Sequence, residues 1–401
     1  MRQGRADDTI ARGLLPRYLA AAGAARVADE GARVSLVLLA LHETNSAAVG
    51  AAMVAALLVP HVVAAPLVGS VIDRARRPRW VLAAMVLVFA SALLSVAQLV
   101  GRTPLWVVLA VLLLGGCCGP AITGGLTSQL PGLVGPERAP RAFGLDSLFY
   151  NVSSMAGPAL AGLTAAAAGP RAAQSLLAGS AALGAAGVAA LPIAAHPQPY
   201  RTARPSHLDG VREILHERML RLVTLSSALG QLGPGALPIV AALLATSLDR
   251  PTASGLLLAA VAAGSFLGSL LWTWHPVAPH RSPLVTTVSM IGIGAPLAGA
   301  AAASSIGATA VLFGLSGIFI GPFAAALFTA RSQYAAEAYR TQVFTIGAGL
   351  KVTASALGAA MIAPLTGLPV WVLLLIVSSS PLLAGLIGTL LLMLRPPEPG
   401  P

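Results

Sequence analysis

The stretch of residues 69–81 reads GSVIDRARRPRWV and lies between two long apolar segments. It contains one acid and four arginines: Asp73, Arg74, Arg76, Arg77 and Arg79. Hydrocarbon cannot solvate this cluster, so both apolar segments must reach the same membrane surface here. Short loops rich in arginine stay on the cytoplasmic side of a membrane. The stretch therefore predicts a cytoplasmic loop from which the topology of the remaining chain follows.

The composition of the whole chain is that of a membrane protein. Hydrophobic residues make up 56% of its 401 residues and charged residues only 10%, with a mean hydropathy of +0.81. Soluble globular domains carry about 25% charged residues. A net charge of +11 would suggest nucleic-acid binding in a soluble chain,. Here the arginines follow the membrane topology, so we expect a lipid bilayer and no nucleic acid as partner.

Successive apolar segments are long enough to cross about 30 Å of hydrocarbon. We expect twelve such spans, at residues 14–41, 46–72, 79–101, 105–130, 142–168, 171–195, 219–247, 252–274, 283–303, 305–330, 342–365 and 369–394. The predicted cytoplasmic segments hold nineteen basic residues, whereas the external loops hold only Arg102, Arg171 and Arg250. This asymmetry predicts a protein of the plasma membrane with both termini in the cytoplasm.

A polar, proline-bearing break at residues 196–218 divides the chain into two halves. We predict an N-terminal bundle of six helices in residues 1–195, a cytoplasmic linker at the break, and a C-terminal bundle of six helices in residues 219–401. The fold class is thus an all-α membrane protein with twelve transmembrane helices in two pseudo-symmetric six-helix bundles.

An internal repeat supports this division. Shifting the sequence by 202 residues lays Gly119-Pro120 on Gly321-Pro322 and Asp29 on Gln231. Tandem repeats of this kind occur in transporters whose halves are related by an axis along the membrane normal. We therefore expect Asp29 and Gln231 to face one another across a central cavity. The second half's counterpart of the opening stretch, at residues 268–272, has lost the acid.

The opening stretch also carries a family resemblance. Gly69-x-x-x-Asp73-Arg74, followed by the basic residues Arg76 and Arg77, resembles the signature between the second and third helices of the major facilitator superfamily of transporters. The replacement of the family's later glycine by Arg76 is similar to many bacterial drug-exporter-like members. The resemblance implies a conformational latch in which the acid and the following arginines join the two bundles, and Gly69 allows two helices to approach closely.

The first predicted span carries four charged residues at helical spacing. Arg26, Asp29, Glu30 and Arg33 lie at i, i+3, i+4 and i+7, so they share one face of a helix near the middle of the bilayer,. Charges at that depth are costly unless they face a water-filled cavity or one another. They can therefore form a transport site in which Asp29 or Glu30 carries a proton. The alternative is a self-neutralised set of two i,i+4 ion pairs.

Three uncharged polar residues of the spans are further candidates. His61 follows a proline near the middle of the second span and titrates near neutral pH in water, although a lone helical histidine is more often a packing residue. Gln231 lies in the proline-broken stretch GQLGPGALP of the seventh span, and Asn151 in the fifth. We expect His61 to be a candidate for proton coupling and Gln231 and Asn151, with Arg26 and Arg33, to be candidates for substrate contact. Two roles are open for Lys351: its side chain can extend toward the headgroups or belong to an inner gate.

The predicted function is a secondary-active transporter that exports a small, amphiphilic organic molecule or drug by proton antiport. Residues 157–162 are similar to part of the signature of drug/proton antiporters on the fifth helix. The alternatives are an importer or uniporter of a small metabolite, or a non-transporting membrane receptor on a transporter fold. We expect no catalytic residues, cofactor or metal ion, and a monomer. The sequence does not name the substrate or the direction of transport.

Overall fold

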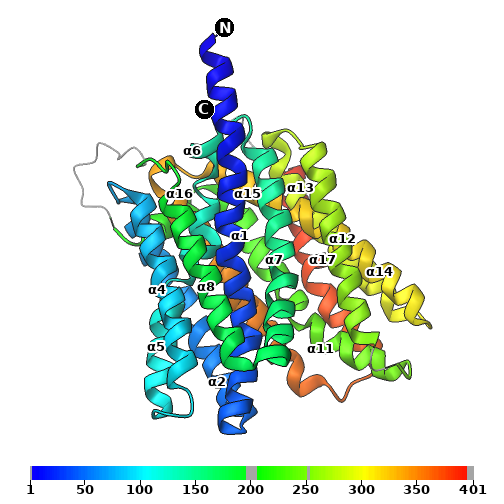
Figure 1. Ribbon diagram of the computed structural model, residues 1–401. Coiled ribbons are helices and arrows are strands. Elements are labelled where there is room, and N and C mark those ends of the chain that lie inside the picture. The colour runs from blue at the N-terminus through cyan, green and yellow to red at the C-terminus, as the bar shows by residue number, and fades with distance from the viewer. Residues whose placement is uncertain (1, 196–205, 251–252, 395–401) are drawn as a thin grey trace. The chain divides into compact units, whose positions relative to one another are not determined.

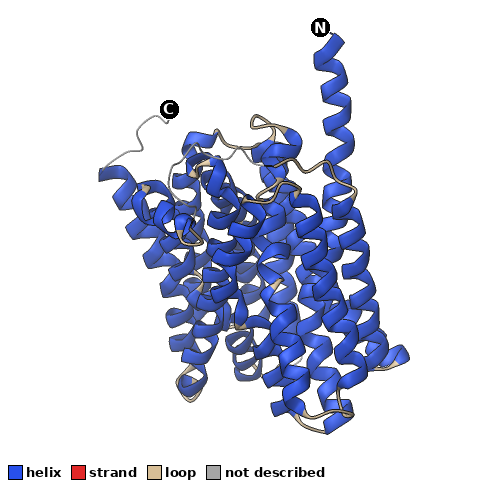
Figure 2. Cartoon of the chain, turned by 90° about the vertical axis from the view of Figure 1, so that its left-hand side faces the viewer, coloured by secondary structure: helices blue, strands red, loops and turns tan. Residues whose placement is uncertain are grey.

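The computed structural model describes residues 2–195, 206–250 and 253–394, with side chains from Gly13 onward (Figure 1). Within these ranges the chain is helical, with turns and short loops between helices and no strand (Figure 2). The predicted all-α class is therefore confirmed. Residues 196–205 of the predicted linker and 395–401 of the predicted tail lie outside the described residues.

The helices follow the predicted spans closely along the chain. Before the linker they are α1 (Arg2–Thr44), α2 (Ala47–Leu58), α3 (Pro60–Asp73), α4 (Pro78–Leu99), α5 (Leu105–Cys117), the π-helical η1 (Ala121–Gly125), α6 (Leu130–Val134), α7 (Ala139–Ala168) and α8 (Pro170–Ala189). From the linker onward they are α9 (Asp209–His216), α10 (Arg218–Gly230), α11 (Leu232–Ser247), α12 (Ser254–Trp274), η3 (Pro279–Arg281), α13 (Ser282–Gly299), η4 (Ala300–Ala302), α14 (Ile306–Ile318), α15 (Ile320–Tyr334), η5 (Glu337–Tyr339), α16 (Arg340–Ile362), η6 (Ala363–Leu365) and α17 (Val370–Leu394).

Ten helical segments of the described chain are long and apolar enough to cross a membrane. The multi-pass character is therefore shown, whereas the total of twelve spans is not, because α1 and α7 fall outside the ten. Arg26, Asp29, Glu30 and Arg33, which form a charged stripe along α1, lower the hydropathy of that helix. Polar and small residues around Asn151 lower that of α7. That α1 and α7 also cross the membrane stays a prediction.

Glycine and proline interrupt several of the spans. The seventh predicted span is broken at Gln231, between α10 and α11. The fourth is broken around Gly119-Pro120, where α5 gives way to η1, and the tenth just before Gly321-Pro322, where α14 gives way to α15. Proline lacks an N–H and cannot continue the hydrogen-bond ladder of a helix. The 202-residue repeat thus relates two interruptions of the same kind.

By packing, the chain forms two compact units. The first unit comprises Met1–Arg138, Val152–Arg212 and Ala336–Gly349, and the second comprises Ala139–Asn151, Glu213–Ala335 and Leu350–Pro401. The first turns of α7 therefore belong to the second unit, and the first turns of α16 belong to the first. These units group parts of helices by contact, so the predicted division of the sequence at residues 196–218 stays a prediction.

Each unit has its own apolar core. In the first unit α1 packs along α8, α8 along α4, and both α2 and α4 against α5, with Tyr18, Leu36 and Phe89 fully buried. In the second unit α13 packs along α17, α12 along α14 and α11 against α17, with Phe313 and Leu373 fully buried.

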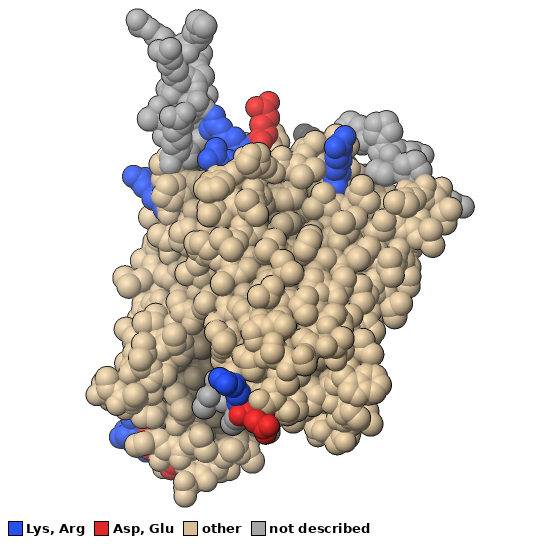
Figure 3. Space-filling view, turned by 90° about the vertical axis from the view of Figure 1, so that its right-hand side faces the viewer, with Lys and Arg blue, Asp and Glu red and all other residues tan. Residues whose placement is uncertain are grey.

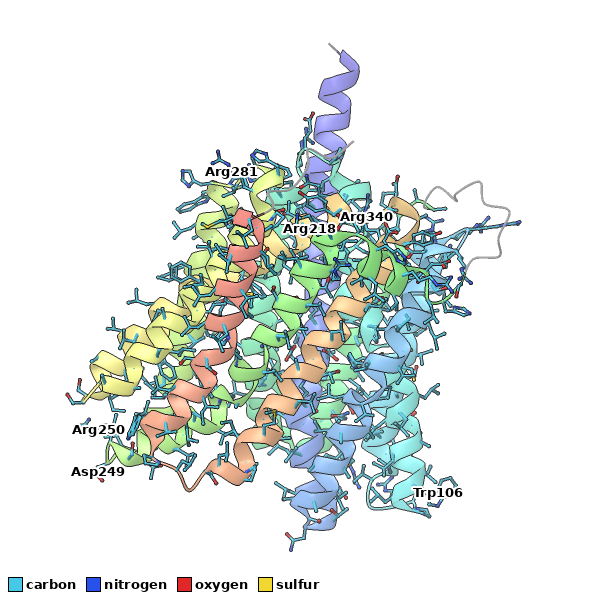
Figure 4. The ribbon with its side chains drawn as sticks, turned by 180° about the vertical axis from the view of Figure 1, so that it is seen from behind. Trp106, Arg218, Asp249, Arg250, Arg281 and Arg340 are labelled. Carbon is cyan, nitrogen blue, oxygen red and sulfur yellow. The ribbon has the colours of Figure 1, made fainter. Side chains whose placement is uncertain are left out.

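Several exposed charged side chains of the second unit lie at the ends of its helices. Within the second unit, Arg218 and Arg281 lie at one end, and Asp249 and Arg250 lie at the other (Figure 4). On the face shown in Figure 3, acidic and basic side chains gather near the ends and leave an uncharged surface between them. A surface of this kind suits contact with hydrocarbon, where an exposed charge is costly.

Candidate proton-coupling and substrate site

The charged stripe of α1 is buried within the first unit. Asp29 is 1% exposed and Glu30 is 8% exposed. Arg33 donates from Nη2 to Oδ2 of Asp29 (3.2 Å) and from Nη1 to Oε2 of Glu30 (2.9 Å). One guanidinium group therefore binds both carboxylates, and the pair of Asp29 with Arg33 has the spacing expected from the sequence.

Arg26 links the same stripe to the interrupted fourth predicted span. It is fully buried and donates from Nη2 to the hydroxyl of Thr127 (2.9 Å), which in turn donates to the carbonyl of Thr123 in η1 (3.1 Å). A π-helical segment opens the regular hydrogen-bond ladder, and such segments are frequent at functional sites. The charged stripe thus contacts the part of the unit where the backbone is least regular.

His61 lies close to this charged group. Its ring is buried at the start of α3 and packs on Gly119, where an added Cβ would come within 2.2 Å of both Cε1 and Nε2. Only glycine leaves room for the imidazole there. The carbonyls of Leu57 and Leu58 lie toward the ring, but neither ring nitrogen makes a hydrogen bond of good geometry with the described residues. Asp29 and Arg33 act on it electrostatically.

This arrangement, which we call the α1 cluster (Arg26, Asp29, Glu30, Arg33 and His61), has the chemistry that proton transfer requires. Two carboxylates share one guanidinium group, so protonation of either one leaves Arg33 paired with the other. An imidazole with no well-formed hydrogen bond stands nearby to accept or release a proton. Because all these groups are buried, their charge state depends strongly on their neighbours. The structure therefore brings together all three residues expected to couple protons.

The other two substrate candidates, Asn151 and Gln231, belong to the second unit. Asn151 donates from Nδ2 to the hydroxyl of Ser269 on α12 (3.2 Å). Gln231 lies at the junction of α10 and α11, where its carbonyl accepts a hydrogen bond from the N–H of Gly235 (3.1 Å). The expectation that Gln231 faces Asp29 concerns residues of different units and stays a prediction.

Asp73, the acid of the opening stretch, caps a helix from the other half of the sequence. It is buried at the end of α3, where Oδ1 accepts from the backbone N–H of Thr341 (3.1 Å) and Oδ2 from that of Gln342 (3.0 Å). The first N–H groups of a helix have no partner inside the helix, and the helix dipole favours an anion there. Asp73 thus stabilises the N-terminus of α16.

The remaining residues of the predicted latch surround this contact. A Cβ on Gly69 would lie 2.5 Å from both Cα of Gln342 and Oγ1 of Thr345, so glycine is required for α3 to meet α16. Arg74 ends α3, and Arg77 is exposed and immediately precedes α4. The close approach expected from the family resemblance is therefore present.

The linker also contacts the same place. His207 Nδ1 lies 3.0 Å from the hydroxyl of Ser70 on α3, and the N–H of Gly210 donates to Oε1 of Gln342 (2.9 Å). Gln342 therefore uses its backbone for Asp73 and its side chain for the linker. Sequence reasoning missed these contacts because a polar linker carries no pattern that predicts its docking site.

The second half has a different joint at the position related by the repeat. The indole N–H of Trp272 donates to the carbonyl of Pro140 (3.2 Å), near the start of α7. Pro140 corresponds to Gln342 by the 202-residue shift, and a proline has no N–H for a carboxylate to bind. The second half, which has no acid at the counterpart of Asp73, therefore also has no N–H at the counterpart of Gln342.

Arg331 and Lys351 are two cations of the second unit. Arg331 directly follows the predicted span 305–330, lies in the last turn of α15, is 1% exposed and donates to the hydroxyl of Ser227 (3.4 Å). The Nζ of Lys351 lies 5.0 Å from the centre of the Phe323 ring. The predicted spans from residue 219 onward contain no acid that could pair with either cation.

The described residues contain no cluster of three or more His, Cys, Asp or Glu side chains that could hold a metal ion.

A family model described as Major Facilitator Superfamily matches residues 19–235. An uncharacterized MFS-type transporter, y4rN, from Sinorhizobium fredii is 27% identical over 350 residues, which cover 86% of each chain.

Two solved structures show the same fold at low sequence identity. One is a bacterial homologue of the iron transporter ferroportin in an outward-facing state, with a TM-score of 0.75 and 16% identity over 95% of this chain and 98% of that chain. The other is the fucose:proton symporter FucP of E. coli, with a TM-score of 0.71 and 13% identity over 96% of this chain and 98% of that chain.

Proposed function

The chain belongs to the major facilitator superfamily, and we propose that it exports a small, amphiphilic organic molecule by proton antiport. It is a multi-pass membrane transporter and not an enzyme. In this proposal it acts as a monomer in the plasma membrane, with both termini in the cytoplasm.

The observation that carries the coupling part of the proposal is the α1 cluster. Asp29 and Glu30 share Arg33, and His61 lies within electrostatic reach of Asp29 and Arg33. Buried ionisable groups in a membrane protein are retained for function by default, because burying them is costly. A proton on either carboxyl group would release Arg33 from one partner, and this gives a bound proton a way to change the contacts of α1.

Alternating access would follow from the joint at Asp73. Two charge-assisted hydrogen bonds hold the start of α16 on α3, and they must break for the cytoplasmic ends of these helices to separate. In the proposed cycle, the joint is formed when the cytoplasmic side is closed and broken when the substrate enters from the cytoplasm. The arginines around it keep the loop at the cytoplasmic surface.

The substrate part rests on the lining available to a cavity. The spans are rich in alanine, glycine and aliphatic residues and poor in the Asn, Gln and aromatic side chains that a sugar site would use. The runner-up is proton-coupled import, for which the same carboxylates would serve. Transport of fucose with protons by a protein of the same fold keeps this alternative open.

The test is made in proteoliposomes with an imposed pH gradient. Internal pyranine reports proton flux, and two amphiphilic fluorophores, the anion pyrenebutyrate and the cation ethidium, report substrate flux. We expect Asp29→Asn combined with Glu30→Gln to lower gradient-driven transport by about a hundredfold, as for loss of a proton-transfer group, while downhill exchange continues.

The matched control is Glu43→Gln. It removes a carboxylate from the same helix, where Glu43 pairs with Arg171 (2.7 Å) far along α1 from the cluster. Undiminished coupling in the double variant would remove the coupling role from these carboxylates. Proton and substrate movement in the same direction in the wild-type protein would replace export with symport.

A further inference from the structure

The second unit encloses two cations, one on α15 and one on α16, whose charges act on one another. Arg331 lies on α15 and is 1% exposed, and Lys351 lies on α16 and is partly buried. The positive charge of Arg331 acts electrostatically on Lys351. Like charges in a medium of low dielectric constant repel strongly. Something must offset this repulsion for both side chains to stay charged.

The described residues supply no anion for this purpose. Arg331 donates to the Ser227 hydroxyl at the long distance of 3.4 Å, and its Nε finds no hydrogen-bond partner within the part of the chain that the structure describes. Lys351 faces the ring of Phe323. Among the described residues, no carboxylate forms an ion pair with either cation.

The polar groups around Arg331 are also incompletely used. Thr224 lies three residues before Ser227, the partner of Arg331, on α10, and its buried hydroxyl makes no hydrogen bond with the described residues. The C-terminal end of a helix favours a cation, and Arg331 lies in the last turn of α15,. This explanation does not extend to Lys351, which lies eleven residues, or about 17 Å, into α16,.

We propose that Arg331 and Lys351 together bind the anionic group of the transported molecule, so that the substrate is an amphiphilic organic anion such as a carboxylate. The guanidinium Nε offers a donor for two-point binding of a planar anion, and the ammonium group offers a point charge. The ring of Phe323 provides apolar surface beside the charge. This proposal rests on the proposed function only in taking the bound anion to be the transported molecule.

The experiment measures binding to the purified full-length protein in neutral phosphatidylcholine nanodiscs. Fluorescence titration compares pyrenebutyrate with its uncharged methyl ester. We expect the wild-type protein to bind the anion at least tenfold more tightly than the ester, as for a buried charge-assisted hydrogen bond. Equal affinity for the two would overturn the proposal.

Variants identify the cations responsible. Lys351→Met and Arg331→Gln should each weaken anion binding about tenfold or more and leave ester binding unchanged. Arg331→Lys should retain part of the preference because it keeps the charge. Arg281→Gln, which removes an exposed arginine of the same unit, should bind as the wild type does. Unchanged anion preference in Lys351→Met would overturn the proposal, even if Arg331→Gln fails to fold.

Thermal stability gives a readout that a purely structural role would not produce. Removing one of two unpaired like charges should leave the Tm of ligand-free Lys351→Met unchanged or higher, while pyrenebutyrate no longer raises it. A lower Tm of the ligand-free variant would show that Lys351 stabilises the fold and would overturn the proposal.

An anionic lipid could supply the same chemistry. If the anion comes from a headgroup, exchanging phosphatidylcholine for phosphatidylglycerol should displace pyrenebutyrate, and this result would overturn the assignment to the transported molecule. Persistent binding in phosphatidylglycerol supports it. Equilibrium binding needs neither a proton gradient nor a direction of transport, so its failure is distinguishable from failure of the proposed export.

Discussion

At the scale of single residues, Asp73 has a well-defined structural role. It accepts hydrogen bonds from two backbone N–H groups of α16 and lies at the N-terminus of that helix, where a negative charge is favourable,. Asparagine keeps the shape of the side chain but loses the charge and one acceptor. Each hydrogen bond to a charged group is worth about 1.5–3 kcal/mol.

We therefore predict that Asp73→Asn lowers the transport rate by about tenfold at matched expression, since about 1.4 kcal/mol corresponds to a factor of ten. Flux is measured in proteoliposomes, with Asp249→Asn, an exposed acid of the second unit, as control. Wild-type flux in Asp73→Asn would show that the loop only anchors the topology.

Gly69 tests the same joint by sterics instead of charge. Alanine at this position would place Cβ 2.5 Å from the backbone of Gln342, which cannot move without shifting α16. We predict that Gly69→Ala also reduces transport, by about tenfold or more, as for overpacking that costs about 1–3 kcal/mol. Gly179→Ala is the matched control, because nothing lies within 4 Å of a Cβ added there in α8. Equal flux in the two variants would contradict the close contact of α3 with α16.

At the scale of elements, the start of α16 is held from two sides. α3 binds its backbone through Asp73, Gly210 of α9 binds the Gln342 side chain, and His207, just before α9, contacts the Ser70 hydroxyl. A linker that holds this junction would have to release it whenever the two helices part. The contact of Ser70 with His207 therefore offers a direct test of whether the linker moves.

We predict that a covalent bridge between Ser70→Cys and His207→Cys, made in a background lacking Cys117 and Cys118, stops transport. The side chains lie within 3.0 Å of one another, so a short bifunctional maleimide or oxidation should join them. Flux should fall below about a tenth of its value, the level expected when a required conformational step is blocked, and reduction of a disulfide should restore it. The single variants are the controls. Full flux in the bridged protein would mean that the linker and α3 stay together throughout the cycle.

At the scale of the whole molecule, the membrane orientation is the prediction with the widest consequences. Within the second unit, Arg281 lies at the opposite end from Arg250 (Figure 4). We expect Arg250→Cys to react with a membrane-impermeant maleimide in intact cells, and Arg281→Cys only after permeabilisation. The background again lacks Cys117 and Cys118. The reverse pattern of labelling would place the arginine-rich stretch outside and invert the proposed direction of transport.

Much of the fold could be predicted from periodicity and hydropathy. An apolar helix that satisfies its own backbone is one of the few ways to cross hydrocarbon, so the helical segments and the interruption at Gln231 follow from the chain itself. The contact of Asp29 with Arg33 could also be predicted, because side chains four residues apart lie on the same face of a helix,. The two predicted spans that are not among the ten apolar helical segments are α1 and α7, in which candidate site residues lower the hydropathy.

The sequence by itself determined the helical class, the helical spacing of the four charged residues of α1, and the presence of an acid and a glycine beside the arginine-rich loop. Only the tertiary structure decided what these residues touch. Asp73 binds N–H groups 268 and 269 positions away, and Arg331 is buried although it directly follows the predicted span 305–330. The physical reason is that hydrophobic burial and helical periodicity are local properties of the sequence, whereas the partner of a buried charge depends on how distant helices pack.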